Sequence, residues 1–459
     1  MATRPVVEVR PFPVTRRRAR PDSTSDPVMN KSRRAVTARR LPWYPRSDEG
    51  RTVDESSRSG PVSPPAGPLY TPLHPDTLQD PYRAFRLLRE NDPVHWHAEL
   101  DSWVLTRYED CVAVLRDAQR FRSDFRSIGE EVPQSALSVQ MLDPPEHAAI
   151  RHLLVGAVRE QRFGGLRTEI RELVRSRLAE ASTGGTFDFV ERVARPVALR
   201  TICRVLGVDE PGGAEFEAMS NAIVRSMDGG LDGSRLEPGA RARAELSELL
   251  AAWAGRPAPG TFIDRVMRRR ERYGVPAPLV INSLRAMLHA GYESASRLLG
   301  NAVSALVADP QAGAKALHAG VPDAAIDELV RFDPPVQADA RVCATDCGLG
   351  GRRLARGSVV TVLIGAANHD PAVFTDPGRL LPDRSANPHL GFGKGVHACL
   401  GAQLARVEMA AVLGALAQYD DRGLALRPAG DPVREPTATL RGLSRLPVRL
   451  EAGAAGGEQ

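Results

Sequence analysis

The chain has 459 residues, of which 42% are hydrophobic, and a formal net charge of +5. No apolar stretch approaches the roughly 18 residues that a membrane-spanning helix needs, so we expect no membrane span. Five cysteines, an odd number without framework spacing, argue against a disulfide scaffold and favour reduced thiols in the cytoplasm.

The basic charge is concentrated at the start of the chain. Residues 1–51 hold thirteen Lys/Arg and five Asp/Glu, a net of +8, which leaves −3 for the remainder. Residues 1–65 show no sustained helical or strand period, and such a segment buries too little apolar surface to offset its ordering entropy. We therefore expect a disordered basic N-terminal tail. Attraction to nucleic acid or to an anionic membrane, a transit peptide and a misassigned start codon remain open as alternatives.

Residues 66–459 are expected to form a single, mainly helical domain with small sheets. Val94–His97 and Ser102–Thr106 alternate like paired strands, and a helix is expected from Tyr108 to Arg116. Further helices are expected around 213–228 and 238–254, and Ser358–Ile364 is the clearest later strand. A long helical pattern covers about 279–308, where apolar residues recur at spacings of three and four.

A glycine-rich loop places Cys399 just before a second strong helix pattern, at about 399–418. A cysteine at a helix N-terminus meets unpaired backbone N–H groups and the positive end of the helix dipole, which favour its thiolate. Such a thiolate can be a nucleophile, a zinc ligand or an axial ligand of haem iron. Gly393 allows backbone turns that other residues resist, and Phe392 offers a flat apolar face to a flat cofactor.

The loop from Phe392 to Gly401 resembles the cysteine loop of the cytochrome P-450 family, and it matches that family's Phe-x-x-Gly-x-His/Arg-x-Cys-x-Gly at every fixed position. The resemblance extends over roughly residues 68–450. It implies the cytochrome P-450 fold, with haem b (iron protoporphyrin IX) held between the helix at about 279–308 and the cysteine-loop helix. It also implies that Cys399 is the axial ligand of the haem iron. The alternative is a buried, unreactive cysteine beside a glycine turn.

The long helix contains Ala290-Gly291-Tyr292-Glu293-Ser294, which is similar to the family's oxygen-activation segment. The resemblance implies that Gly291 lets dioxygen lie against the helix, and that Glu293 and Ser294 deliver protons through water. Ser294 stands where the family usually has threonine. Serine lacks the methyl group that restricts the threonine rotamer, so the transfer of electrons to product is expected to be less tightly coupled.

Two further motifs match the family at positions that bind haem or support the fold. His147 and Arg151 share a helix face, and with Arg341 and His397 they match the residues that bind the haem propionates. Glu328 and Arg331 lie three residues apart on one helix face, and with Arg384 they resemble a buried ion-pair group behind the cysteine loop. Alone, each pattern is also explained by an ordinary surface pair.

Together these residues predict a monomeric, cytoplasmic, haem-thiolate monooxygenase that uses dioxygen. The chain has no flavin or Fe–S segment, so electrons are expected from NADPH through a ferredoxin reductase and a ferredoxin. The expected substrate is an apolar small molecule such as a terpenoid or polyketide, and no nucleic-acid partner is expected. Oxidative coupling or desaturation, a peroxygenase activity and a non-catalytic haem sensor remain alternatives.

Overall fold

The computed structural model describes residues 70–160, 163–183, 185–317 and 322–452. The predicted basic tail at 1–65 and its boundary with the catalytic domain lie outside these residues, so both stay predictions. Within the described residues, no helix is long and apolar enough to cross a membrane.

The fold is mainly helical with small sheets, as predicted from the sequence. The α-helices of the described residues are α1 (Pro75–Gln79), α2 (Pro81–Asn91), α3 (Tyr108–Arg116), α4 (Glu146–Arg159), α5 (Phe163–Ser182), α6 (Arg195–Leu206), α7 (Gly213–Ser226), α8 (Leu236–Gly255), α9 (Phe262–Arg269), α10 (Ala277–Ala308), α11 (Pro310–Leu317), α12 (Asp323–Phe332), α13 (Ile364–Ala367) and α14 (Ala402–Asp420). The strands are β1 (Val94–His97), β2 (Ser102–Leu105), β3 (Phe121–Arg122), β4 (Thr186–Asp188), β5 (Ala338–Cys343), β6 (Cys347–Leu349), β7 (Arg352–Leu354), β8 (Val359–Leu363), β9 (Leu424–Pro428), β10 (Val433–Arg434), β11 (Leu443–Arg445) and β12 (Pro447–Ala452).

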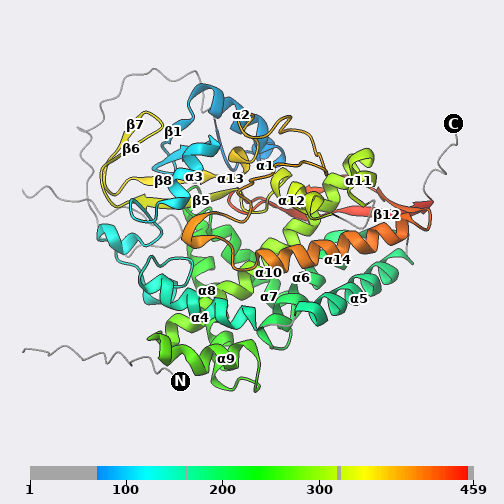
Figure 1. Cartoon of the computed structure of the whole chain (residues 1–459), viewed down its shortest axis with the longest axis horizontal. Coiled ribbons are helices and arrows are strands. Elements are labelled where there is room, and N and C mark those ends of the chain that lie inside the picture. The colour runs from blue at the N-terminus through cyan, green and yellow to red at the C-terminus, as the bar shows by residue number, and fades with distance from the viewer. Residues whose placement is uncertain (1–69, 161–162, 184, 318–321, 453–459) are drawn as a thin grey trace, which may run out of the picture. The chain divides into compact units, whose positions relative to one another are not determined.

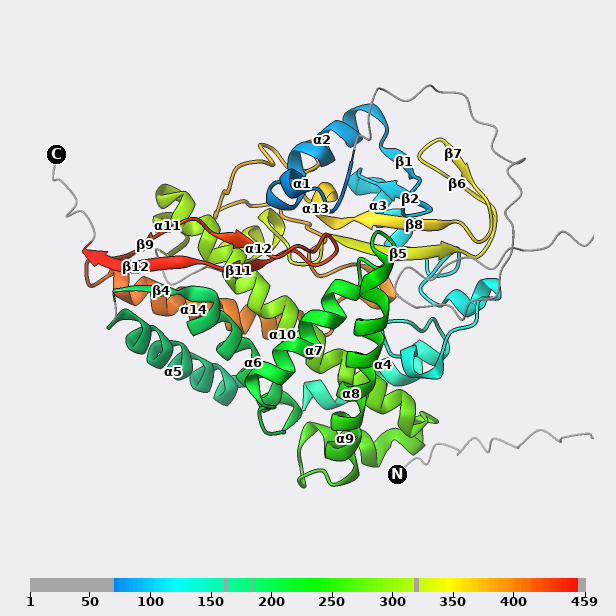
Figure 2. The same ribbon diagram turned by 180° about the vertical axis from the view of Figure 1, so that it is seen from behind.

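The largest sheet joins segments that are distant in the sequence. Its strand order is β1-β2-β8-β5-β3, with β2 and β8 parallel and the other neighbours antiparallel. The β1–β2 hairpin predicted from the alternation is present, with Val94 opposite Leu105. Figure 2 shows α2, α3 and α13 beside this sheet, at one end of the helical part.

The helical part is built around α10. This 32-residue helix packs against α6, α8 and α14, and Figure 1 shows α14 and α5 running beside one another. One apolar core joins α5, α10, α12 and α14, and a second joins α4, α6, α7, α8, α9 and α10. Because α10 belongs to both cores, it fixes the positions of the residues that it carries in its middle turns.

The two helices predicted to flank the cofactor are both present, with shifted bounds. The long helix begins at Ala277 and ends at Ala308. The cysteine-loop helix α14 begins at Ala402, three residues later than predicted, because Gly401 takes the N-cap position with φ −91° and ψ 5°. Cys399 therefore lies in the loop, two residues before that N-cap.

An acidic side chain is buried in the middle of α14. Glu408 is 3% exposed and lies near Thr201 of α6, and no ion pair in the described part of the chain includes it. Burial raises the pKa of the Glu408 carboxyl from its ordinary 4.5 to about 8, and the Thr201 hydroxyl opposes this only in part. The carboxyl is consequently protonated at neutral pH.

Candidate active site

The loop before α14 is shaped by glycine and by backbone hydrogen bonds. The amide of Cys399 donates to the Phe392 carbonyl at 2.9 Å, which closes the loop. Gly395 has φ +72°, and a Cβ there would collide with the Leu115 carbonyl oxygen at the end of α3. Only glycine satisfies both the left-handed backbone and this close approach.

Cys399 is the one exposed cysteine among the described residues. Enough protein nevertheless surrounds the thiol that burial raises its pKa. The N–H groups of Gly401 and Ala402 and the charges of Arg151 and Arg406 oppose that rise without reversing it. The backbone N–H groups before α14 therefore favour the thiolate as expected, but burial of the thiol outweighs them in its pKa. Coordination to a metal ion deprotonates a thiol outright, so the raised pKa does not argue against a ligand role.

Phe392 does not leave both faces of its ring free. The Arg406 guanidinium lies 4.6 Å from the ring centroid, and Arg406 in turn pairs with Asp327 at 2.7 Å. Gly393 has φ +64° and meets no clashing atom where a Cβ would stand. Arg406 of α14 and Asp327 of α12 therefore hold this part of the loop in place.

Two histidines 250 residues apart in the sequence meet beside the cysteine loop. The rings of His147 on α4 and His397 are 4.3 Å apart between centroids. Nε2 of His147 is buried without a hydrogen-bond partner within the described residues, and Nε2 of His397 is 3.7 Å from Oδ1 of Asp143. Nη2 of Arg151 donates to the Ala398 carbonyl at 2.6 Å. Burial first, and then the neighbouring charge of His397, lower the pKa of His147 to about 4.

The unpaired nitrogen of His147 provides a test of whether the residues fit haem. Buried polar atoms normally have a hydrogen-bond partner, so this Nε2 atom and the nearby Arg151 suit an acidic ligand group such as a propionate. Arg341, the remaining predicted propionate residue, is 5% exposed, and its Nη1 donates to Asp339 at 2.7 Å and to the Ala340 carbonyl. The residues around Cys399 thus fit haem, although Arg341 already has partners on its own strand.

One face of α10 is partly open along its middle turns. Between Asn282 and Val303, the partly exposed residues are Met287, Ala290, Gly291 and Ser294, and all others are buried. Their spacing of three, one and three places them on one side of the helix. The Ser294 hydroxyl donates to the Ala290 carbonyl at 2.7 Å. This face is apolar apart from that hydroxyl.

Gly291 also has a packing role that the sequence did not predict. A Cβ at this position would stand 2.7 Å from Cδ1 and 2.8 Å from Cγ1 of Ile202 on α6. Glycine therefore allows α6 to approach α10 closely. This packing role does not depend on the expected role of Gly291 beside dioxygen.

The carboxylate of Glu293 does not contact Ser294, because it is held on another side of α10. Its Oε1 accepts a hydrogen bond from Ser220 of α7 at 2.5 Å, and its Oε2 accepts one from Nε of Arg297 at 3.0 Å. All three residues are at least 95% buried. Sequence reasoning missed both partners. The spacing of four between Glu293 and Arg297 could have indicated one of them, but nothing local indicates Ser220.

The predicted support group forms a buried ion-pair cluster. Arg331 forms two hydrogen bonds with Glu328, at 2.7 and 2.9 Å, and Nε of Arg384 donates to Glu328 at 2.9 Å. Glu328 and Arg331 are both 0% exposed, and Arg331 also donates to three backbone carbonyls, those of Asn368, Pro377 and Arg379. The cluster ties α12 to the segment that leads into the cysteine loop.

The segment at 122–140 is joined to α10 by hydrogen bonds. Nδ2 of Asn282 donates to the carbonyls of Gln134 and Leu137, and Nη1 of Arg285 donates to the Ser135 carbonyl. Phe125 of this segment is 1% exposed and packs with Val342 and Val359 in a small core. Phe125 is therefore a core residue.

Comparison with known proteins places the chain in a family. The cytochrome P-450 family model matches residues 321–419. The chain is 32% identical to the vitamin D(3) 25-hydroxylase of Pseudonocardia autotrophica over 386 residues, which cover 81% of this chain and 94% of the relative. The chain belongs to the cytochrome P-450 family. It is also 32% identical to the beta-dihydromenaquinone-9 omega-hydroxylase of Mycobacterium tuberculosis over 392 residues, covering 83% of this chain and 78% of that one.

Solved structures agree with the family assignment. A Bacillus megaterium cytochrome P-450 in complex with testosterone superposes with a TM-score of 0.74 at 26% identity, covering 82% of this chain and 98% of the other. This protein is accordingly a cytochrome P-450 monooxygenase that uses a haem-thiolate cofactor and dioxygen.

Proposed function

We propose that this cytochrome P-450 hydroxylates a large apolar molecule of terpenoid or polyketide type. The observation that carries the proposal is the open face of α10, where Met287, Ala290 and Gly291 surround a single hydroxyl, that of Ser294. Such a face suits a substrate with few polar groups, because burying a polar group without a hydrogen-bond partner costs free energy. The names of the relatives describe oxidation of a menaquinone and of vitamin D3, both large and apolar.

Each site residue has a distinct task in the proposal. Cys399 holds haem b through the iron, and His147, Arg151, Arg341 and His397 hold the propionates. When bound in this way, the haem supplies the dioxygen activation and the C–H oxidation chemistry. Glu293 supplies protons toward the side of α10 that carries Ser294, and the Ser294 hydroxyl orders the water that passes them on. The cluster of Glu328, Arg331 and Arg384 supports the loop.

A ferredoxin is the proposed electron donor. Two basic residues lie at the cysteine loop, because Lys394 belongs to it and exposed Arg116 ends the helix that approaches Gly395. Basic side chains there would attract an acidic redox protein and raise its rate of association. Charge reversal at Arg116 should therefore raise the ferredoxin concentration needed for half-maximal reduction. A matched reversal at exposed Arg353, on β7, should leave it unchanged.

The test begins with spectroscopy on the purified full-length protein. The carbon monoxide complex of the reduced protein should show the strongly red-shifted Soret band of a thiolate-ligated haem, and Cys399→Ser should abolish it. A band that persists in Cys399→Ser would remove Cys399 as the ligand.

Substrate class is then tested with vitamin D3, testosterone, a menaquinone and a macrolactone, using NADPH, a surrogate ferredoxin and its reductase. Products that gain one oxygen atom support hydroxylation. Loss of two hydrogens without a gain of oxygen would indicate desaturation or coupling instead. Failure to oxidise any of the four compounds, despite a normal carbon monoxide spectrum, would contradict the proposed substrate class.

A further inference from the structure

An arginine and an aspartate meet beside the cysteine loop, and neither has a task in the function proposed above. Nε and Nη2 of Arg406 on α14 donate to the same carboxylate oxygen of Asp327 on α12, at 3.1 and 2.7 Å. The guanidinium also lies 4.6 Å from the ring centroid of Phe392. Arg406 is therefore held by a carboxylate and by an aromatic face at once, which fixes the position of its charge.

The carboxylate of Asp327 is shared with a histidine. Nε2 of His389 lies 3.5 Å from the oxygen that binds Arg406, and the His389 ring is 5.6 Å from that of Phe392 between centroids. Burial raises the pKa of Asp327, but the hydrogen bond to His389 and the charge of Arg406 outweigh burial, so the pKa lies below its ordinary 3.8. Asp327 is therefore ionised at neutral pH, and its negative charge offsets that of Arg406.

The charge of Arg406 acts on the residue that is expected to bind the iron. The amide of Cys399 donates to the Phe392 carbonyl, so the sulfur and the ring beside the guanidinium belong to one closed loop. Burial, the larger influence, raises the pKa of the Cys399 thiol, and the charges of Arg151 and Arg406 lower it. The fold thus places a positive charge where it stabilises negative charge on the sulfur, and a carboxylate where it weakens that effect.

We propose that Arg406 and Asp327 together set the reduction potential of the haem, an inference that rests on the ligand role proposed for Cys399. Reduction adds one electron from the donor protein to the iron, and no bond breaks. A positive charge near the sulfur stabilises the reduced state, because that state carries one more negative charge. Asp327 limits this stabilisation. Both are positioning residues, since they act through Phe392 and Cys399.

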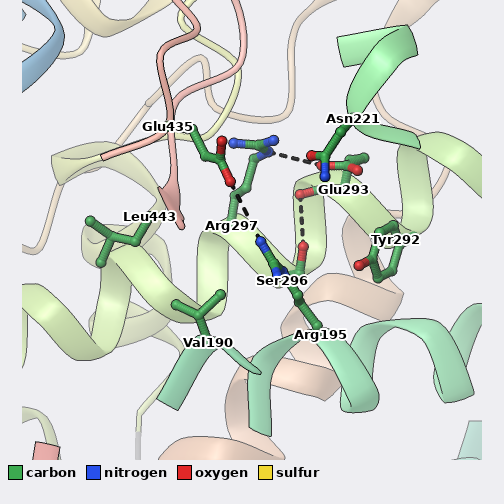
Figure 3. Close-up of a pocket in the computed structure, with 9 residues that line it drawn as sticks. All are labelled: Val190, Arg195, Asn221, Tyr292, Glu293, Ser296, Arg297, Glu435 and Leu443. Carbon is green, nitrogen blue, oxygen red and sulfur yellow. Dashed lines mark hydrogen bonds and ion pairs between the residues drawn. The ribbon is translucent and has the colours of Figure 1, made fainter. Parts of the chain in front are cut away.

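Solvent reaches this ion pair, which distinguishes it from the ion pair on α10. The side chains of Asp327 and Arg406 are 28% and 35% exposed, whereas those of Glu293 and Arg297, drawn in Figure 3, are both 6% exposed. Dissolved salt screens charges that are in contact with solvent much more than it screens buried ones. The effect of Arg406 on the potential should therefore become smaller as the ionic strength rises.

Three variants separate the effect of charge from that of packing. Arg406→Gln removes the positive charge, and Asp327→Asn removes the negative one. Arg406→Lys keeps the charge but lacks the planar group that lies over Phe392. All three should bind haem with the wild-type carbon monoxide spectrum, because none of them changes the cysteine loop itself.

Asp92→Asn is the matched control. Asp92, between α2 and β1, pairs with Arg352 at 3.0 Å and with His95 at 2.9 Å, and its side chain is 28% exposed, as is that of Asp327. The same arrangement of arginine, aspartate and histidine thus occurs a second time, outside the cysteine loop and its flanking helices. Asp92→Asn removes an equivalent charge at that second place.

The measurement is the midpoint potential of the purified holoenzyme, obtained by spectroelectrochemical titration with dye mediators and without ferredoxin. At a fixed potential, Arg406→Gln should lower the ratio of reduced to oxidised haem about tenfold, which is about 59 mV for a one-electron couple. Asp327→Asn should raise the ratio, and Arg406→Lys should stay within about twofold of wild type. Asp92→Asn should leave the ratio unchanged. The shift in Arg406→Gln should decrease between about 0.05 and about 0.5 M salt.

Wild-type potentials in both Arg406→Gln and Asp327→Asn would overturn the proposal. An equal shift in Arg406→Lys and Arg406→Gln would also overturn it, because packing on Phe392 would then be the cause. Cys399→Ser separates this proposal from the one on which it rests. If Cys399→Ser keeps the red-shifted Soret band, Cys399 is not the ligand and both proposals fail. If it loses the band while the potentials of the other variants stay at the wild-type value, only the role of Arg406 and Asp327 fails.

Discussion

The buried carboxyl of Glu408 should make the stability of the protein depend on pH. Its pKa of about 8 in the folded chain stands well above the ordinary 4.5 expected when unfolded, so folding takes up a proton between these values. The associated stability is fully present below about pH 4.5 and is lost as the pH rises through about 8. At 1.36 kcal/mol per unit of pH, the full loss amounts to about 5 kcal/mol.

Glu408→Gln should remove this dependence, because glutamine has a similar shape and does not ionise. The free energy of unfolding should be similar for the two proteins near pH 5. By about pH 8.5 the variant should be the more stable by several kcal/mol, with about 5 kcal/mol as the upper bound. Urea denaturation of the holoenzyme, followed by tryptophan fluorescence at intervals of pH, measures the difference.

Glu169→Gln serves as the control, because the side chain of Glu169 is 49% exposed. Its stability should run parallel to the wild-type curve from pH 5 to 8.5, where the Glu169 carboxyl stays ionised because Arg204 lowers its pKa. If the curves of Glu408→Gln and wild type are parallel from pH 5 to 8.5, the Glu408 carboxyl does not have a raised pKa in the folded protein. The reasoning from burial would then be refuted.

Three further predictions concern the site. His147→Phe should weaken haem binding about tenfold through loss of one hydrogen-bonding partner, measured by haem transfer to apomyoglobin; unchanged transfer would remove His147 from the propionate site. Ser294→Ala should leave haem content unchanged and divert electrons to peroxide, measured as product per NADPH, whereas wild-type coupling would exclude Ser294 from proton transfer. Glu328→Gln should destabilise the fold by about 3–5 kcal/mol in urea denaturation, because it removes the shared anion of two buried arginines. A loss below about 1 kcal/mol, typical of exposed pairs, would contradict the burial argument.

The sequence was most informative where the spacing of a few nearby residues is enough to define the local structure. The helix at α10, the hairpin of β1 and β2 and the Glu328–Arg331 pair all follow from local spacing, and the structure contains each of them. The cysteine loop could be recognised because glycine is required at Gly395 by backbone conformation and by contact with α3.

Contacts between distant segments could not be predicted in this way. Ser220 lies 73 residues before Glu293, and no periodicity indicates that α7 would place its hydroxyl on that carboxylate. The raised pKa of Cys399 likewise depends on how much protein surrounds the loop, which the position of the cysteine before a helix does not reveal. The Arg406 side chain over Phe392 is a third example, because it depends on how α14 folds back on the loop.

The attachment of residues 134–137 to α10 has a consequence for recombination with related enzymes. Asn282 and Arg285 hold three carbonyls of that segment, although about 150 residues separate the two parts of the chain. A chimera that exchanged the segment alone would keep these donors but risk changing the carbonyl positions that they require. Crossover points should therefore be chosen so that residues 134–137 and the first three turns of α10 come from the same parent.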